Sequence, residues 1–102
     1  MTKVGEHITL DIIGTTQEYD PSVYESVIHK IAKAADVTVL EISKYKFEPQ
    51  GFTILALLAE SHISFHTFPE KGIISFDFFT CGKISPSIAL DIVKKEFKHK
   101  RI

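Results

Sequence analysis

The sequence predicts an α+β fold, a two-layer α/β sandwich in which two helices cover one face of a mainly antiparallel sheet. Three observations support this prediction. Segments rich in β-branched and aromatic residues end at Gly, Pro or other turn residues. Two stretches carry apolar residues at helical spacing, and the elements follow the order β-α-β-β-β-β-α. With 102 residues, the chain is expected to form a single domain, residues 1–102.

The first strand and the first helix have clear sequence signals. Residues 7–13, His-Ile-Thr-Leu-Asp-Ile-Ile, alternate in the manner of a strand and end at Gly14. The pair Asp20-Pro21 indicates a helix start, because Asp caps free backbone N–H groups and Pro is tolerated at the first helical position. The helix is expected to run to about Ala35. Its apolar stripe consists of Val23, Val27, Ile31 and Ala34.

The middle of the chain predicts four strands, at residues 37–47, 52–59, 63–67 and 73–80. Pro and Gly mark turns at residues 48–51 and 69–72. The strand at residues 52–59 is nearly all apolar, so we expect it to be central or covered on both faces.

A second helix is expected near the C-terminus, where Ser85-Pro86 repeats the helix-start signal. Its apolar stripe consists of Ile88, Ala89, Ile92, Val93 and Phe97. Two helices cover only one face of a sheet. Pairing with a second protomer would stabilise the other face.

Composition narrows the class of protein. The chain is 44% hydrophobic, 11% aromatic and 25% charged, which excludes disorder, collagen and a coiled coil. Its net charge of −1 creates no general attraction to nucleic acid. No apolar run is long enough to span a bilayer, and the N-terminus lacks a signal-peptide core. Neither nucleic acid nor a membrane is therefore expected as a partner. With a single cysteine, Cys81, the chain cannot form an internal disulfide and is expected to be cytoplasmic.

Polar and ionisable residues that could take part in catalysis or ligand binding cluster after the apolar strand. They are Glu60, Ser61, His62, Ser64, His66, Thr67, Glu70, Asp77, Thr80 and Cys81. Ser61 and His66 are a candidate nucleophile and base. On one straight strand they would lie roughly 16–17 Å apart on opposite faces, so the chain must bend or they must meet another way. Zinc binding by His62, His66 and Cys81 is a second interpretation, although an i,i+4 pair has no special meaning on a strand. The third is a solvated or backbone-bonded strand end without catalytic function.

Two motifs resemble a known family. Residues 58–70 read Leu-Ala-Glu-Ser-His-Ile-Ser-Phe-His-Thr-Phe-Pro-Glu, and residues 77–82 read Asp-Phe-Phe-Thr-Cys-Gly. Together they resemble the short prokaryotic S-adenosylmethionine decarboxylase proenzymes. Residues 7–14 and 47–51 also resemble that family, and the resemblance runs essentially end to end.

The resemblance implies a self-processing enzyme that cuts itself between Glu60 and Ser61. Residues 1–60 then form a beta chain and residues 61–102 an alpha chain. Ser61 becomes a covalent pyruvoyl group, the cofactor, whose carbonyl forms a Schiff base with the substrate amine and accepts electrons during decarboxylation.

The resemblance also implies roles for other residues. His66 is the proton acceptor in processing, Thr53 supports processing, and Cys81 is the proton donor in catalysis. The substrate-binding residues it implies are Phe47, which stacks on adenine, Glu70, which holds ribose hydroxyls, and the aromatic Phe68. Three positions depart from the common family pattern: Thr53 replaces Ser, Phe68 replaces Trp or Tyr, and Lys71 replaces an aromatic residue.

The expected function is decarboxylation of S-adenosylmethionine for spermidine biosynthesis. The resemblance implies a homodimer of processed protomers, with sites completed across subunits. No metal is expected. One alternative is a pyruvoyl-dependent arginine or ornithine decarboxylase of the same family, because Lys71 adds a cation beside Glu70. The other is a non-catalytic ligand-binding domain, or a metal-binding domain that uses His62, His66 and Cys81.

Overall fold

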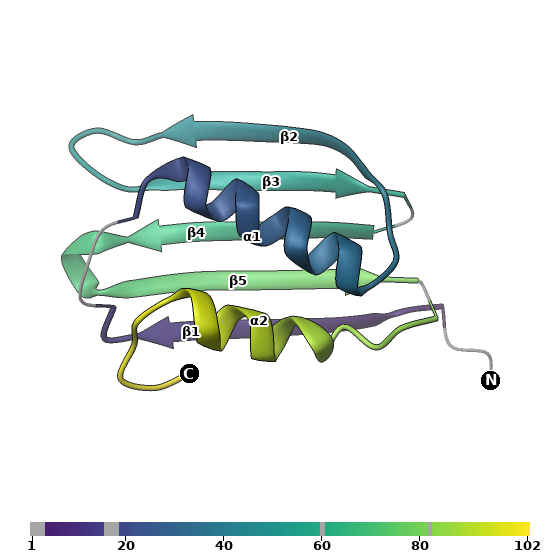
Figure 1. The fold of residues 1–102 in the computed structure, drawn as a ribbon. Helices are drawn as coiled ribbons and strands as arrows, with labels where there is room; N and C mark the ends of the chain where they lie inside the picture. The colour runs from purple at the N-terminus through teal and green to yellow at the C-terminus, as the bar shows by residue number, and fades with distance from the viewer. Residues whose placement is uncertain (1–3, 16–18, 60, 82) are drawn as a thin grey trace.

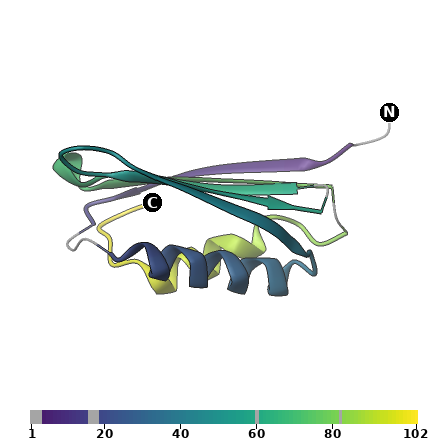
Figure 2. The same ribbon diagram turned by 90° about the horizontal axis from the view of Figure 1, so that it is seen from above.

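The computed structural model describes residues 4–15, 19–59, 61–81 and 83–102. Within them, the chain forms one five-stranded antiparallel sheet with two α-helices packed on one face (Figures 1 and 2). The predicted α+β sandwich is therefore confirmed. The elements are β1 (Glu6–Ile13), α1 (Pro21–Ala34), β2 (Val39–Lys46), β3 (Phe52–Leu58), β4 (Ser61–Phe68), the 3₁₀ helix η1 (Pro69–Lys71), β5 (Ile73–Thr80) and α2 (Ile88–Glu96).

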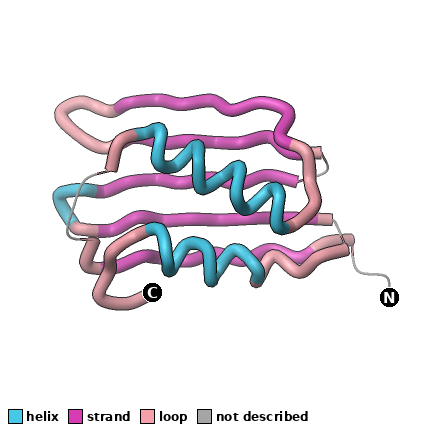
Figure 3. Tube along the Cα trace, viewed as in Figure 1, coloured by secondary structure: helices cyan, strands magenta, loops and turns pink. Residues whose placement is uncertain are grey.

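The strand order is β1-β5-β4-β3-β2, so β4 lies in the centre of the sheet (Figure 3). Ser61, the first residue of β4, pairs with Leu58 of β3 and with Thr80 of β5. β1 pairs with β5 along its whole length, although the two strands are far apart in the sequence. The central strand thus carries the polar residues that follow the apolar β3.

β4 is longer than the sequence predicted. It begins at Ser61 rather than at residue 63, because pairing with β3 and β5 continues through its polar first residues. The turn expected after it is η1, which ends at Gly72 with a left-handed backbone, φ +64°. Glycine is suited to this conformation because it has no Cβ.

The two helix-start signals have different outcomes. Asp20 caps α1 as predicted, since its side chain accepts a hydrogen bond from the Ser22 backbone N–H at 2.9 Å. α2 begins at Ile88, three residues after Ser85. Ser85 instead accepts a hydrogen bond from the Ser87 backbone N–H at 3.3 Å, which forms a local turn before the helix. Neither helix, nor any other among the described residues, is long and apolar enough to cross a membrane.

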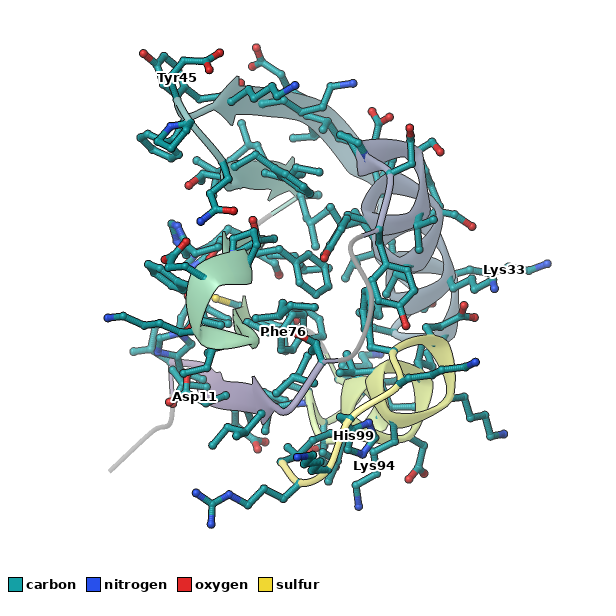
Figure 4. The ribbon with its side chains drawn as sticks, turned by 90° about the vertical axis from the view of Figure 1, so that its left-hand side faces the viewer. Asp11, Lys33, Tyr45, Phe76, Lys94 and His99 are labelled. Carbon is teal, nitrogen blue, oxygen red and sulfur yellow. The ribbon has the colours of Figure 1, made fainter. Side chains whose placement is uncertain are left out.

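The core lies between the sheet and the helices, where Phe76 is visible in Figure 4. The Phe65 ring of β4 is fully buried, with its centroid 4.9 Å from that of Phe76 and 5.2 Å from that of Tyr24 on α1. Lys33 and Lys94 extend from the helices into solvent (Figure 4). The helices therefore cover one face of the sheet with a packed aromatic cluster.

The other face of the sheet, called the open face from here on, has no covering layer among the described residues of the single chain (Figure 2). Leu55 and Leu57 of β3 point to it and are 47% and 51% exposed. Of the two alternatives expected for residues 52–59, the interior position is confirmed, since β3 lies between β4 and β2, whereas cover on both faces does not hold among the described residues of the single chain. Buried and exposed residues alternate along the second half of β3, since both helices lie on the same side.

Candidate active site

Ser61 and His66 lie on opposite faces of β4. Ser61 is buried on the helix side with Ile63 and Phe65, whereas His66 is exposed on the open face. β4 pairs with its neighbours through both residues without a register shift, so the chain does not bend between them. Five residues of strand span about 17 Å. The two side chains therefore do not meet within one chain.

The serine end of the sheet brings a hydroxyl and a thiol to neighbouring strands. The Ser61 Oγ donates a hydrogen bond to the Thr80 Oγ1 at 3.1 Å, and both side chains are buried. Cys81 follows Thr80 directly, and its free thiol is exposed. Ser61 is thus placed beside the strand end that presents Cys81. Glu60 and Gly82 lie outside the described residues.

The histidine end, at the opposite end of β4, brings together Thr53 and His66. The two residues are directly paired across β3 and β4, and the Thr53 Oγ1 lies 3.0 Å from the His66 Nδ1, in hydrogen-bond contact. This contact fixes the orientation of the imidazole and leaves the Nε2 atom for other partners.

The predicted substrate-binding residues meet at the histidine end. Phe47, Phe68 and Glu70 line a pocket of about 260 Å³ that also includes Thr53 and His66. Two aromatic residues, a carboxylate and an imidazole in one small pocket suit a ligand with an aromatic ring and hydroxyl groups.

Gln50, which the sequence analysis did not name as a site residue, contacts Glu70 in the pocket. The Gln50 Nε2 donates a hydrogen bond to the Glu70 Oε2 at 3.1 Å, so the turn after β2 holds the carboxylate in the pocket. The Lys71 ammonium lies 5.9 Å from the centroid of the Phe68 ring, in cation–π contact. Gln50 falls within the motif at residues 47–51, but only the turn between β2 and β3 shows that it faces Glu70.

A shallow cavity of about 520 Å³ runs along the open face between the two ends. Asp77 of β5 lies in this cavity and accepts hydrogen bonds from the Ser64 hydroxyl and from the Nε2 atoms of His7 and His62. Burial raises the pKa of Asp77, but these hydrogen bonds outweigh it and hold the pKa below its ordinary value. Asp77 is therefore a charged carboxylate at neutral pH. No sequence pattern predicted that His7 would lie beside Asp77, because 70 residues separate the two along the chain.

The predicted zinc set, His62, His66 and Cys81, is not brought together. His62 and His66 share the open face but stand about 13 Å apart along β4, since each residue of a strand advances about 3.3 Å. Cys81 lies at the serine end, away from His66. Among the described residues, the group that could hold a metal ion consists of His7, His62 and Asp77.

Comparison with known proteins places the chain in a family. Residues 6–102 match the family model described as S-adenosylmethionine decarboxylase. The chain belongs to this family.

Its relatives include S-adenosylmethionine decarboxylase proenzymes from bacteria. The protein from Brevibacillus brevis is 37% identical over 97 residues, covering 92% of this chain and 73% of that protein. The protein from a Synechococcus species is 42% identical over 98 residues, covering 93% and 77%. A crystal structure of the adenosylmethionine decarboxylase from Aquifex aeolicus matches with a TM-score of 0.84 and 32% identity, covering 99% of this chain and 86% of that one.

Membership of the S-adenosylmethionine decarboxylase family confirms two expectations from the sequence. The motif resemblance is correct, and the chain is an enzyme of the carboxy-lyase class. A role in polyamine formation follows from the family.

Proposed function

We propose that this chain is a pyruvoyl-dependent S-adenosylmethionine decarboxylase that makes its own cofactor and supplies decarboxylated S-adenosylmethionine for spermidine biosynthesis. The observation that carries the proposal is the separation of the candidate residues into two ends. One end presents Ser61 beside Cys81, and the other presents Thr53 and His66 in a pocket with Glu70. Relatives over nearly the whole chain are named as proenzymes of this decarboxylase.

Processing would start at the hydroxyl of Ser61. Its oxygen attacks the carbonyl carbon of Glu60, the peptide C–N bond breaks, and the chain is held by an ester with a free amine on Ser61. Loss of the Cα proton and of the Cβ–O bond releases residues 1–60 with a carboxylate end and leaves dehydroalanine. Water then replaces the nitrogen, ammonia leaves, and residues 61–102 begin with the pyruvoyl group.

His66 would accept a proton during processing, with Thr53 fixing its ring through the 3.0 Å contact. The imidazole cannot reach Ser61 of its own chain, because the two lie at opposite ends and on opposite faces of β4. A homodimer would remove the separation along β4. A two-fold axis across the open face would lay the serine end of one protomer over the histidine end of the other. It would also cover Leu55 and Leu57.

The pyruvoyl group supplies an electron sink for the carbon that loses carbon dioxide. The protein residues then bind and protonate. Cys81, with an exposed thiol beside the start of β4, returns a proton to the substrate carbon. Phe47 and Phe68 offer aromatic faces to adenine, and Glu70 accepts hydrogen bonds from ribose hydroxyls.

The substrate is tested by carbon dioxide release from carboxyl-labelled S-adenosylmethionine, arginine and ornithine. We expect release from S-adenosylmethionine alone, because Glu70 is held by Gln50 while Lys71 is turned toward Phe68. Glu70→Gln should raise KM more than it lowers kcat. The control Glu96→Gln alters an α2 carboxylate outside the pocket, paired with Lys30, and should leave KM unchanged. Release from arginine or ornithine instead would overturn the proposed substrate.

A further inference from the structure

Three side chains that the proposed reaction does not use converge on the open face. His7 on β1 and His62 on β4 are each paired with Phe79 on β5, one from either side. Asp77 stands two residues before Phe79 on the same face of β5. Strand register therefore places two imidazoles on either side of one carboxylate.

The donor atoms of these side chains are close enough to share one ion. The Asp77 Oδ2 lies 2.9 Å from the His7 Nε2 and 3.0 Å from the His62 Nε2, and all three atoms lie within 4.8 Å of one another. A zinc ion binds nitrogen and oxygen ligands at about 2.0–2.2 Å, so neighbouring ligand atoms of a tetrahedral site stand about 3.3 Å apart. The two nitrogen–oxygen distances differ from that spacing by about 0.3–0.4 Å, and the two Nε2 atoms, which lie within 4.8 Å of each other, would adjust to the same spacing as the ion binds.

The surrounding residues hold the group in place. The Ser64 hydroxyl donates to the Asp77 Oδ1, which leaves Oδ2 directed at the imidazoles. The Phe79 ring stacks on His62 with an interplanar angle of 22° and meets the His7 ring edge-on at 76°. Outer contacts that orient ligand side chains are typical of metal sites in proteins.

We propose that His7, His62 and Asp77 form a binding site for one divalent transition-metal ion such as zinc. Two neutral imidazoles and one carboxylate are a donor set that zinc prefers, and a fourth position remains for water on the cavity side. In the single chain, 46%, 39% and 24% of the side chains of His7, His62 and Asp77 are accessible, so an ion can enter from solvent before a second protomer covers the open face.

The ion would join three adjacent strands of the sheet. His7 precedes the bond between Glu60 and Ser61 in the sequence, whereas His62 and Asp77 follow it. The same ion would therefore connect the two pieces of the processed enzyme. Only this last consequence rests on the proposed function, since the site itself exists in the uncut chain.

The test uses the full-length chain and its uncut variant Ser61→Ala, both freed of metal by dialysis against a chelator. Zinc chloride is titrated by calorimetry, and cobalt(II) is titrated by visible absorption. We expect one ion per chain for both proteins, with d–d bands for cobalt but no thiolate charge-transfer band. His7→Gln should weaken binding by about tenfold or more, and Asp77→Asn should do the same. The matched control His29→Gln, an exposed histidine of α1, should bind like the parent.

Circular dichroism of each variant checks that loss of binding is not loss of folding. The proposal is overturned if folded wild-type protein shows no saturable binding, or if His7→Gln binds as well as the parent. It is also overturned by a thiolate band, because Cys81 would then be a ligand. Zinc binding by both proteins together with failed decarboxylation by the wild-type chain would support the metal site while refuting the proposed function.

Discussion

Two variants that cannot cut themselves are expected to restore cutting when they form mixed dimers. Ser61→Ala removes the attacking hydroxyl, and His66→Ala removes the proton acceptor. In a mixed dimer, the Ser61→Ala chain still offers an intact His66, and the His66→Ala chain still offers an intact Ser61. One of the two composite sites is then complete.

The expected fraction of cut chains follows from the shared site and from random pairing of the two variants. In the proposed dimer, each site takes Ser61 from one protomer and His66 from its partner, because about 17 Å along β4 separates the two residues within one chain. With equal amounts and random pairing, about half of the His66→Ala chains have a Ser61→Ala partner, so about half of them should be cut. The Ser61→Ala chains should stay whole in every pairing.

The assay is intact mass spectrometry of the two variants co-expressed with different tags, which identify the chain that was cut. Each variant expressed alone is the control and should remain a single species. If dimers are verified by size and no His66→Ala chain is cut in the mixture, the composite site is refuted. Cutting of His66→Ala alone at the wild-type rate would refute the role of His66.

Three further predictions concern catalysis, acid stability and the core. Cys81→Ala should still cut itself but lose decarboxylation by at least about a hundredfold, because proton return is removed; equal loss of both in a mass and carbon dioxide assay would contradict this. The pKa of Asp77 is depressed in the folded chain, so its stabilisation is present above the unfolded pKa of about 3.9 and is lost as pH falls through the folded value. Asp77→Asn should therefore lower unfolding free energy in urea at pH 7 more than at pH 3, and a pH-independent difference would contradict it. Phe65→Ala should cost about 3–5 kcal/mol in the same assay, since the ring is fully buried among other aromatic rings, and a loss below about 1 kcal/mol would contradict that packing.

Much of the fold could be predicted because local patterns agree with it. Asp20-Pro21 gave the start of α1, and the Pro/Gly turns separated the strands correctly. Ser85-Pro86 predicted the start of α2 three residues too early. The Ser85 side chain accepts a hydrogen bond from the Ser87 backbone N–H in a turn instead of capping α2. The apolar composition of β3 did not predict that one of its faces is exposed in the single chain. Composition does not reveal whether the second face of a strand is covered by the same chain or by another.

The candidate site was predictable as a set of residues but not as an arrangement. The family resemblance implied roles for Thr53 and His66, yet their contact depends on the register between β3 and β4, which no local pattern encodes. The same reason explains why His7 was not connected with Asp77. Those two residues meet only because β1 returns to pair with β5 at the far end of the sequence.

The most direct test of the central claim is the intact mass of the purified, folded chain. We expect two species, residues 1–60 and residues 61–102, the second lighter by one ammonia than a peptide beginning with Ser61 and open to reductive labelling of its terminal carbonyl. Ser61→Ala should give one species. A wild-type chain that remains a single 102-residue species after folding is verified would contradict the account.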